Sequence, residues 1–336
     1  MNDLSAILTH SVDRFLADIA DCPLDDAEAW QSIEEMGLPA LFLPESDGGM
    51  QGSWSDAHIV LQSCGYHAMP FPVGETMIGN RLLQEHEMEP ATGMLALGIG
   101  KGRMDGDDRF DGHIDALSPV LPGNTMLAQV ALEQGEACIL LDTGCAAGFA
   151  PSSNAAGEPR GRLTVSDAPV RQLRNVAPGT LFRLGAFLRS CQISGALAAC
   201  LERTTRYAGE RSQFGRELRQ FQAIQHQIAL LAEESAAIAS ASASAAQALD
   251  YGNADFAIAC AKLRANMATG SSALIAHQVH GAIGITEEYA LHRYTRRLWA
   301  WRSEFGNDRH WAQELGRMVL AHDGDTAWEF LTKRRA

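Results

Sequence analysis

The sequence predicts an α+β protein in which a region of β-strands lies between two helical regions. Apolar residues recur at helical spacing near the N-terminus, and the chain is again helical in character from about residue 178 to near its end. Between these regions, residues 91 to about 172 hold short apolar runs separated by Gly, Asp, Asn and Pro, which is the pattern of strands joined by turns. We therefore expect an N-terminal helical domain over 1–88, a small middle β domain over 89–175 and a C-terminal four-helix bundle domain over 176–336.

The first predicted element is an amphipathic helix at the N-terminus. Its apolar face consists of Leu4, Ile7, Leu8, Val12, Phe15, Leu16 and Ile19. The segment has no basic stretch followed by a continuous apolar run, so we do not expect it to be a secretion signal.

The strands of the middle region are predicted by the apolar runs LALGIG, AQVALE and ACILLD. Residues 98–102, with the sequence GIGKG, come closest to a phosphate-binding loop. However, Arg103-Met-Asp-Gly follows at the point where such a loop would open a helix, so we expect strand there.

The C-terminal region is predicted to form helices near 180–209, 218–250, 254–281, 288–302 and 308–321. The second of these contains an alanine-rich stretch with Ile228, Leu231 and Ile238 among small residues. Small side chains let neighbouring helices approach closely, so this stretch indicates the core of a bundle.

Composition and charge exclude several classes of protein. The 336 residues are 46% hydrophobic and 20% charged, a globular balance, and the net charge of −14 argues against nucleic acid or an anionic membrane surface as the main partner. No apolar run approaches the length of a membrane span. Seven cysteines without a CxxC pair fit a reducing cytoplasm rather than a disulfide scaffold. His277 and His280 lie three residues apart, but no acidic or thiol side chain shares their spacing, so we expect no metal site.

Two segments of the C-terminal region carry features of a binding site. In the first, Tyr207 to Gln225, Arg211 offers a planar donor fork for a phosphate, Phe214 an apolar face for a flat ring, and Gly215 the freedom for a tight turn between helices. In the second, Gln278 to Arg297, a helix ends at a glycine-bearing loop whose backbone N–H groups can approach an anion closely.

In this order and spacing the two segments resemble the acyl-CoA dehydrogenase family, whose patterns are R-x-x-F-G-x-x-L-x-x-x-Q and Q-x-x-G-G-x-G-x-x-x-E-Y. Residues 30–49, ending in PESDGG, also resemble the early part of that family. The resemblance implies three domains that enclose FAD and an acyl-CoA thioester, with the flavin shared between two chains. It places the following residues on the nucleotide half of a neighbouring chain's FAD: Arg211, Gln213, Phe214, Phe221, Gln222, Gln278, and Gly281 to Gly284. The alternative is that Arg211 and Phe214 only cap and pack a helix junction.

The chain departs from the family at two places. Ala282 replaces the usual second glycine of the second motif. The family's T-E-P-x-x-G-S-D segment, which contacts flavin and substrate, corresponds to residues 95–100, and these lack its acidic and serine residues. The chain is therefore better equipped to contribute to a neighbour's flavin than to hold its own flavin ring. In this it resembles the short chains that pair with full-length chains as α2β2 assemblies in bacterial steroid side-chain dehydrogenases.

The family's reaction needs a carboxylate that removes a proton from Cα of the thioester. By resemblance, the position of this glutamate falls on Phe305, while Glu304 precedes it and Gly306 keeps the place of the family glycine. We take Glu304 as the candidate base; the alternatives are that Glu304 faces solvent, or that Asp308 supplies the carboxylate. The second location used by some relatives aligns near Gly185 and offers no carboxylate, and the neighbouring LFRLGAFLR is cationic instead.

Two functions are thus expected. The first is flavin-dependent α,β-dehydrogenation of an acyl-CoA thioester, with electrons passed to an electron-transfer flavoprotein, by a homo- or hetero-tetramer. The second is a non-catalytic half-site subunit that completes the FAD pocket of a full-length partner. An oxidase of the same fold, which reacts with oxygen, is a third possibility.

Overall fold

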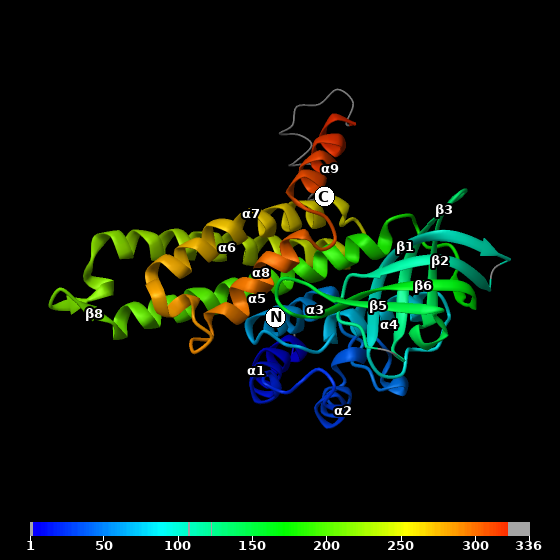
Figure 1. Ribbon diagram of the computed structural model, residues 1–336, viewed down its shortest axis with the longest axis horizontal. Coiled ribbons are helices and arrows are strands. Elements are labelled where there is room, and N and C mark those ends of the chain that lie inside the picture. Colours follow the sequence, from blue (N-terminus) through cyan, green and yellow to red (C-terminus); the bar gives the residue numbers. More distant parts are fainter. Residues whose placement is uncertain (1–2, 107, 122, 322–336) are drawn as a thin grey trace.

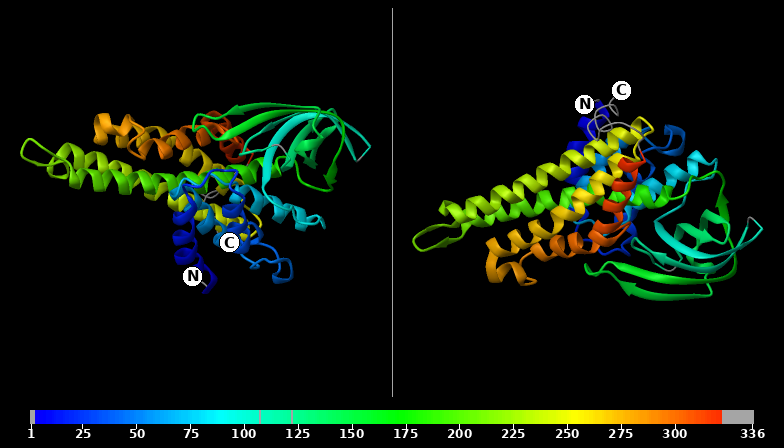
Figure 2. Two further views of the ribbon diagram at one scale, coloured as in Figure 1. Left: turned by 60° about the horizontal axis from the view of Figure 1, so that its bottom comes forward. Right: turned by 90° about the horizontal axis from the view of Figure 1, so that it is seen from above.

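The computed structural model describes residues 3–106, 108–121 and 123–321, and for residues 3–7 it describes the backbone alone. Helices occupy both ends of the described chain, and a sheet lies at one end of the molecule, beside the long C-terminal helices (Figure 1). The N-terminal helices pack against the long helix α5 (Thr180–Glu210), as the turned views also show (Figure 2). The expected α+β fold of helices, sheet and helices is confirmed.

The N-terminal part contains four helices, α1 (Asp3–Ile19), α2 (Ala27–Glu35), α3 (Trp54–Tyr66) and α4 (Val73–Glu85), with short 3-10 turns at Leu38–Ala40 and Glu45–Asp47. The predicted apolar face of α1 is buried at Leu8, Val12 and Leu16. Helix α3 begins at a capping box, because the Ser53 hydroxyl accepts from the Asp56 N–H while the Asp56 carboxylate accepts from the Ser53 N–H.

Seven strands form one sheet in the order β5-β6-β2-β1-β3-β4-β7. Their bounds are β1 (Leu95–Asp105), β2 (Arg109–Ala116), β3 (Thr125–Leu132), β4 (Gly135–Asp142), β5 (Gly148–Ser153), β6 (Pro159–Pro169) and β7 (Arg171–Leu173). Among the strands of the described residues, only β1 and β3 pair in parallel, with Leu95 opposite Thr125. One face has its own core, which includes Phe110, Ile114, Met126 and Leu163, and the other face packs Leu97, Leu127 and Leu140 against the helices.

The GIGKG segment lies inside β1, as expected, and forms no phosphate loop. Its glycines allow the sheet to pair closely: a Cβ at Gly100 would lie 2.4 Å from the carbonyl oxygen of His113 in β2.

The C-terminal part contains α5 (Thr180–Glu210), α6 (Gln222–Asp250), α7 (Asp255–His280), α8 (Leu291–Ser303) and α9 (Asp308–Leu320). Helices α5 to α8 form the predicted bundle, and α9 crosses α7 at its end nearer the sheet (Figure 1). Helix α5 is long and apolar enough to cross a membrane, but 89% of its most apolar window is buried within the fold, as is usual for the central helix of a bundle. It approaches α3 so closely that a Cβ at Gly195 would lie 1.9 Å from the carbonyl oxygen of Gln62.

Candidate functional site

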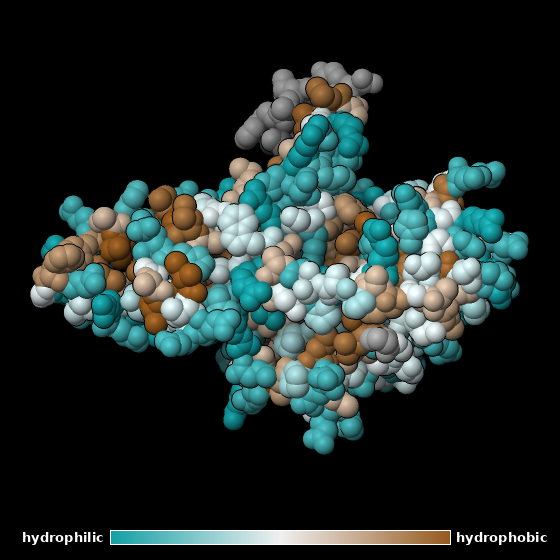
Figure 3. Space-filling model, viewed as in Figure 1, coloured by the Kyte–Doolittle hydropathy of each residue, from teal (hydrophilic) through white to brown (hydrophobic). Residues whose placement is uncertain are grey.

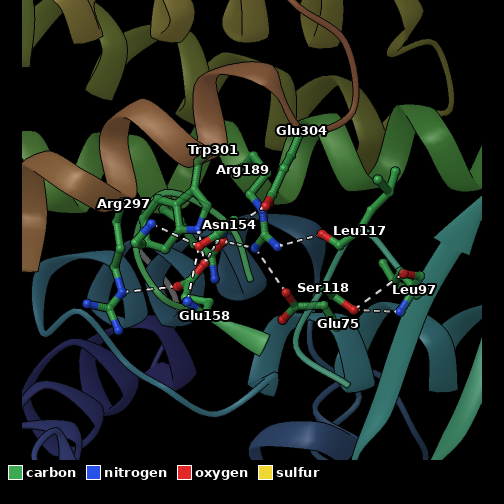
Figure 4. Close-up of polar contacts among 12 residues, drawn as sticks. Glu75, Leu97, Leu117, Ser118, Asn154, Glu158, Arg189, Arg297, Trp301 and Glu304 are labelled. Carbon is green, nitrogen blue, oxygen red and sulfur yellow. Dashed lines mark hydrogen bonds and ion pairs between the residues drawn. The ribbon is translucent and has the colours of Figure 1, made fainter. Parts of the chain in front are cut away.

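Glu304 lies in the turn between α8 and α9, with its carboxylate only 10% exposed. Oxygen Oε1 accepts from Arg160 Nη2 at 2.6 Å, from Arg160 Nε at 3.1 Å and from Asn154 Nδ2 at 3.1 Å. Oxygen Oε2 accepts from Arg189 Nε at 2.7 Å (Figure 4). Both oxygens are therefore engaged by arginine, and the alternative of a solvent-facing glutamate is wrong.

Arg189 is the centre of these contacts. It comes from α5 and is 1% exposed. Its Nη1 donates to Glu75 Oε1 of α4 at 2.9 Å and also to the Gln192 side chain, and its Nη2 donates to the carbonyl oxygen of Leu117 at 3.1 Å. Burial by itself would lower the pKa of Arg189, but attraction by Glu304 and other carboxylates raises it above its ordinary value, so this buried group remains a cation.

A second set of contacts joins the first through Arg160. Arg160 Nη2 donates to Glu158 Oε2 at 3.0 Å, and Glu158 also accepts from Arg297 Nε and from the Trp301 indole N–H, each at 3.1 Å. We call the six charged residues of the two sets the buried ion-pair network: Glu75, Glu158, Glu304, Arg160, Arg189 and Arg297. It holds three acids and three arginines from α4, β6 and the loop before it, α5, α8 and the α8–α9 turn, so it joins the sheet to both helical parts (Figure 4).

Phe305, the position of the family's glutamate by resemblance, is 2% exposed and has a φ of 51°. Its ring lies against Gly185, where a Cβ would come within 2.2 Å of it. Its carbonyl oxygen accepts from the Trp311 indole N–H at 2.9 Å, which fixes the turn. Asp308, the other candidate carboxylate, is paired with Arg302, whose hydrogen bonds lower the pKa of Asp308 below its ordinary value.

A cavity of about 400 Å³ lies on the other side of the Phe305 turn, between the sheet and helices α5 and α9. Phe182 and Trp311 form part of its wall, and the Phe182 ring also contacts the Phe305 ring, with centroids 6.1 Å apart. The residues that line the cavity do not include Glu304. The turn therefore places Glu304 in the buried ion-pair network instead of in the open space.

The first predicted nucleotide-binding segment forms a hairpin at the far end of α5. Strands β8 (Ser212–Gln213) and β9 (Arg216–Glu217) are joined by Phe214 and Gly215, with φ values of 52° and 80°. Two successive positive φ angles are the geometry of a type I′ turn. Phe214 is 92% exposed, and its ring lies 6.3 Å from that of Phe221, which precedes α6 and its first residue Gln222.

The second segment lies at the same end of the bundle. Gln278 is exposed on the last turn of α7, and Gly281, with a φ of 64° and a ψ of −141°, begins a 3-10 turn over Gly281–Ile285. Gly284 is buried, and a Cβ there would lie 2.7 Å from Cβ of His280. The Tyr207 ring of α5 stacks on His280 at 4.6 Å, which brings the two segments together.

This end is remote from the buried ion-pair network and from the sheet (Figures 1 and 2). Arg189 and Arg211 are 22 residues apart along α5, which corresponds to about 33 Å at 1.5 Å per residue. Figure 3 shows hydrophobic residues gathered near the hairpin end, where Phe214 and Ile285 are both largely exposed. The exposed loops and the Glu304 turn therefore cannot belong to one small-molecule site within this chain.

Comparison with known proteins identifies the family. The sequence model described as the C-terminal domain of acyl-CoA dehydrogenases matches residues 175–317. Acyl-CoA dehydrogenase IpdE2 of Mycobacterium tuberculosis is 30% identical over 275 residues, which cover 81% of this chain and 80% of IpdE2. The chain belongs to the acyl-CoA dehydrogenase family.

Other relatives agree. IpdE2 of Mycolicibacterium smegmatis is 29% identical over 283 residues, which cover 81% of each chain. Among solved structures, the ChsE4-ChsE5 complex from Mycobacterium tuberculosis matches with a TM-score of 0.83 and 21% identity over 96% of this chain and 99% of the other. A variant of the Tcur3481-Tcur3483 steroid ACAD matches with a TM-score of 0.82 and 21% identity over 94% and 98%. At this identity the likeness concerns the fold.

The family implies FAD, and by resemblance its flavin-contacting segment corresponds to residues 95–100, which lie in β1. Here the Leu97 N–H donates to Ser118 Oγ at 2.7 Å, and the Leu97 carbonyl accepts from the Leu117 N–H at 2.9 Å. The Leu117 carbonyl is bonded to Arg189 (Figure 4). The polar groups beside this segment are thus bonded within the chain, and the residues present do not fit a flavin ring.

The far end of the bundle differs, because its donors are exposed. Arg211, Gln213 and Gln278 are all exposed, and Gly281 has no atom within 4 Å of the place of a Cβ. Such a set of guanidinium, amide and backbone donors suits the diphosphate and adenosine of a dinucleotide. The residues there fit the nucleotide half of FAD.

Sequence reasoning missed the partners of Glu304. Arg189 lies in the cationic LFRLGAFLR stretch, but nothing in that stretch indicates that it bonds to Glu304. The arginines of α8 also have partners that are distant in the sequence or lie beyond the helix. Arg293 pairs with Asp21, Arg296 donates to the Ala155 carbonyl, Arg297 pairs with Glu158, and Arg302 pairs with Asp308. Their periodic spacing reflects contacts within the chain.

Proposed function

We propose that this chain is the half-site subunit of a flavin-dependent acyl-CoA dehydrogenase, and that it supplies nucleotide-binding loops to FAD whose ring is held by a full-length partner chain. The observation that carries the proposal is the state of Glu304. Both of its carboxylate oxygens accept from buried arginines, and Glu304 does not line the cavity that could hold a substrate, so the carboxylate is paired within the chain instead of being presented to a substrate Cα proton. Gly185 aligns with the second position at which some relatives carry the base, but it has no side chain and is covered by Phe305.

The opposite end of the chain supports the same proposal. Arg211, Gln213, Phe214 and Gln278 are exposed at the far end of the bundle, where Arg211 lies about 33 Å along α5 from Arg189, so they are free to reach a ligand bound by another chain. FAD, when bound, supplies the hydride acceptor of the reaction. Arg211 would bind its diphosphate, while Phe214 and Phe221 would pack on the adenine.

The proposed assembly is a tetramer of two short and two full-length chains. Two solved structures with this fold are the ChsE4-ChsE5 complex and a variant of the Tcur3481-Tcur3483 steroid ACAD, and each of these names joins two chains. The proposed substrate is a CoA thioester, with electrons passed to an electron-transfer flavoprotein. A steroid-derived acyl group is the first class to be screened.

Flavin stoichiometry tests the proposal. The chain is purified alone and also after co-expression with full-length acyl-CoA dehydrogenases encoded near it, and released FAD is measured per polypeptide. We expect little flavin in the folded chain alone and about one FAD per pair of chains in the assembly. About one FAD per chain in the protein purified alone would contradict the half-site role.

A second candidate, a self-contained dehydrogenase with Glu304 as the base, is favoured by the cavity of about 400 Å³ beside the turn. In that case substrate binding must free Glu304 from Arg160 and Arg189.

Glu304→Gln distinguishes the two functions, with Asp308→Asn as its control. With flavin content unchanged, a loss of turnover by orders of magnitude in Glu304→Gln alone assigns the base, whereas near-normal turnover in the assembly supports the half-site. Oxygen consumption without an electron-transfer flavoprotein would identify an oxidase.

A further inference from the structure

The hairpin at the far end of α5 presents two faces with different chemistry. Gln213 of β8 lies opposite Arg216 of β9, and the Leu218 N–H donates to the Arg211 carbonyl at 2.9 Å. Side chains alternate between faces along a strand, and directly opposite residues share a face. Arg211, Gln213 and Arg216 therefore lie on one face, which holds no acidic residue, while Ser212 and Glu217 lie on the other.

Arg216 is held in place without an ionic partner. Its guanidinium carbon lies 4.0 Å from the centroid of the Phe221 ring, and no ion pair is formed by Arg216 within the part of the chain that the structure describes. A guanidinium stacked flat on a ring keeps its N–H edges free for a planar anion. Arg219, in the same hairpin segment, is instead paired with Glu217.

The turn that joins the strands is strained in a way that points to function. Phe214 adopts a positive φ, which is unfavourable for a residue with a Cβ, and its side chain is almost wholly exposed, so little burial compensates beyond an edge contact with the Phe221 ring. The turn holds Gln213 and Arg216 opposite each other. The cost of the conformation is understandable if the face that it orders binds a ligand.

We propose that Arg216 is a further phosphate-binding residue of this chain, acting with Arg211 and Gln213 on the diphosphate of a dinucleotide. The inference rests on the proposed half-site function and deepens it. A dinucleotide diphosphate carries two negative charges, of which Arg211 neutralises one. Arg216, on the same face and preoriented by Phe221, supplies the second cation and a donor fork.

The test uses FAD as the probe and the flavin-containing assembly of the full chain. Arg216→Met keeps an apolar stem on Phe221 and removes the fork, Arg216→Lys keeps the charge, and Arg219→Met is the matched control on the same hairpin. FAD is removed and titrated back, and its dissociation constant is measured at two salt concentrations. We expect roughly tenfold weaker binding and a smaller salt dependence for Arg216→Met, an intermediate effect for Arg216→Lys, and unchanged binding for Arg219→Met.

The outcomes separate this inference from the proposed function. If Arg211→Met weakens FAD binding while Arg216→Met binds as the unmodified chain does, the role of Arg216 is refuted and the half-site remains. If Arg219→Met weakens FAD binding as much as Arg216→Met does, the loss of positive charge on the hairpin explains both effects, and a specific role of Arg216 is refuted. If no flavin-containing assembly forms, or if neither Arg211→Met nor Arg216→Met has an effect, both proposals fail.

Discussion

The ring of Phe305 occupies the place that any side chain at Gly185 would need: a Cβ there would lie 2.2 Å from ring atom Cε1. These are the two positions at which, by resemblance, relatives carry their catalytic carboxylate. In this chain they are in contact and fill each other's space. The Phe305 ring belongs to the hydrophobic core, and Gly185 is buried beside it.

We predict that Gly185→Ala destabilises the protein by about 1–3 kcal/mol, because the Phe305 ring cannot move without disturbing the turn fixed by Trp311. Adding Phe305→Leu to Gly185→Ala should recover part of the loss, since the smaller side chain makes room. Urea unfolding measures both. Gly316→Ala is the control: it lies in α9 with no atom within 4 Å of a Cβ, so it should stabilise the protein by about 0.5–1 kcal/mol. Unchanged stability in Gly185→Ala would contradict the prediction, because it would show that the Phe305 ring and its turn move aside without a cost in free energy.

Acid should weaken the buried ion-pair network through Glu158. Burial by itself raises the pKa of Glu158, but Arg160 and Arg297 outweigh it and lower that pKa below its ordinary value. A carboxylate with a lowered pKa stabilises the fold above its unfolded pKa of about 4.3, and this stability is lost as pH falls through the folded value. The free-energy difference between the unmodified chain and Arg297→Met should therefore shrink between pH 5 and pH 3.5 in urea unfolding.

Arg296→Met is the matched control for this prediction. Arg296 also lies on α8, but it donates to the Ala155 carbonyl, which does not titrate. Its difference from the unmodified chain should stay constant over the same pH range. Equal pH dependence in both variants would contradict the assignment to Glu158.

Lys262 should make stability depend on pH near neutrality. It is fully buried in α7, and its ammonium donates to Asn266 Oδ1 at 2.6 Å and to the carbonyl oxygens of Trp301 at 3.0 Å and Arg302 at 3.1 Å. Burial lowers the pKa of Lys262 to about 7. Between this value and the unfolded pKa of about 10.4, the unfolded chain binds a proton that the folded chain does not, so stability rises with pH.

The rise should be visible in urea unfolding between pH 7 and about pH 7.8, where most unfolded thiols, whose pKa is about 8.5, are still protonated. Lys262→Met should be less stable, because three acceptors lose their donor, and should lack the rise. Lys101→Met, at an exposed position in β1, should keep it. A rise of the same size in Lys262→Met would assign the effect to another group.

Phe214→Gly should separate stability from cofactor binding. Glycine adopts a positive φ without strain, so the variant should unfold at equal or higher urea concentration, with a gain of up to about 1 kcal/mol. It should also release FAD from the assembly more readily, because the exposed ring is lost. Thermal unfolding and FAD retention during dialysis give the two measurements. Retention equal to that of the unmodified assembly would remove Phe214 from the flavin site.

Much of the fold follows from local patterns. The predicted helices over 180–209 and 254–281 agree with α5 and α7 within one residue, because Gly179, which has a positive φ, directly precedes α5, and Gly281, which also has a positive φ, directly follows α7. The helix predicted from 218 begins at Gln222 instead, because Leu218–Gln220 forms a 3-10 turn that closes the hairpin. Helix α8 likewise begins at Leu291 rather than at 288, after the 3-10 turn over Gly281–Ile285.

The candidate site likewise has one part that the local sequence predicts and another part that it does not. The hairpin after α5 and the glycine-bearing turn after α7 were predictable because each is a continuous stretch with its own turn geometry, and their binding of a nucleotide stays a prediction. The environment of Glu304 was not, because Arg189 and Arg160 lie 115 and 144 residues before it in the sequence. No local pattern encodes a pairing over such separations, and the same side chain is compatible with a base or with an ion pair until its neighbours are known.

The length of α5 has an evolutionary consequence. Groups that lie tens of ångströms apart and share no partners contribute to stability almost additively, so substitutions at one end of this helix leave the other end undisturbed. A duplicated gene for a complete enzyme could therefore lose its own chemistry at one end, refill the vacated space with charge pairs and an aromatic ring, and remain under selection for what its other end gives to a sister chain. Such a copy becomes indispensable to its sister at the moment when it ceases to be an enzyme by itself.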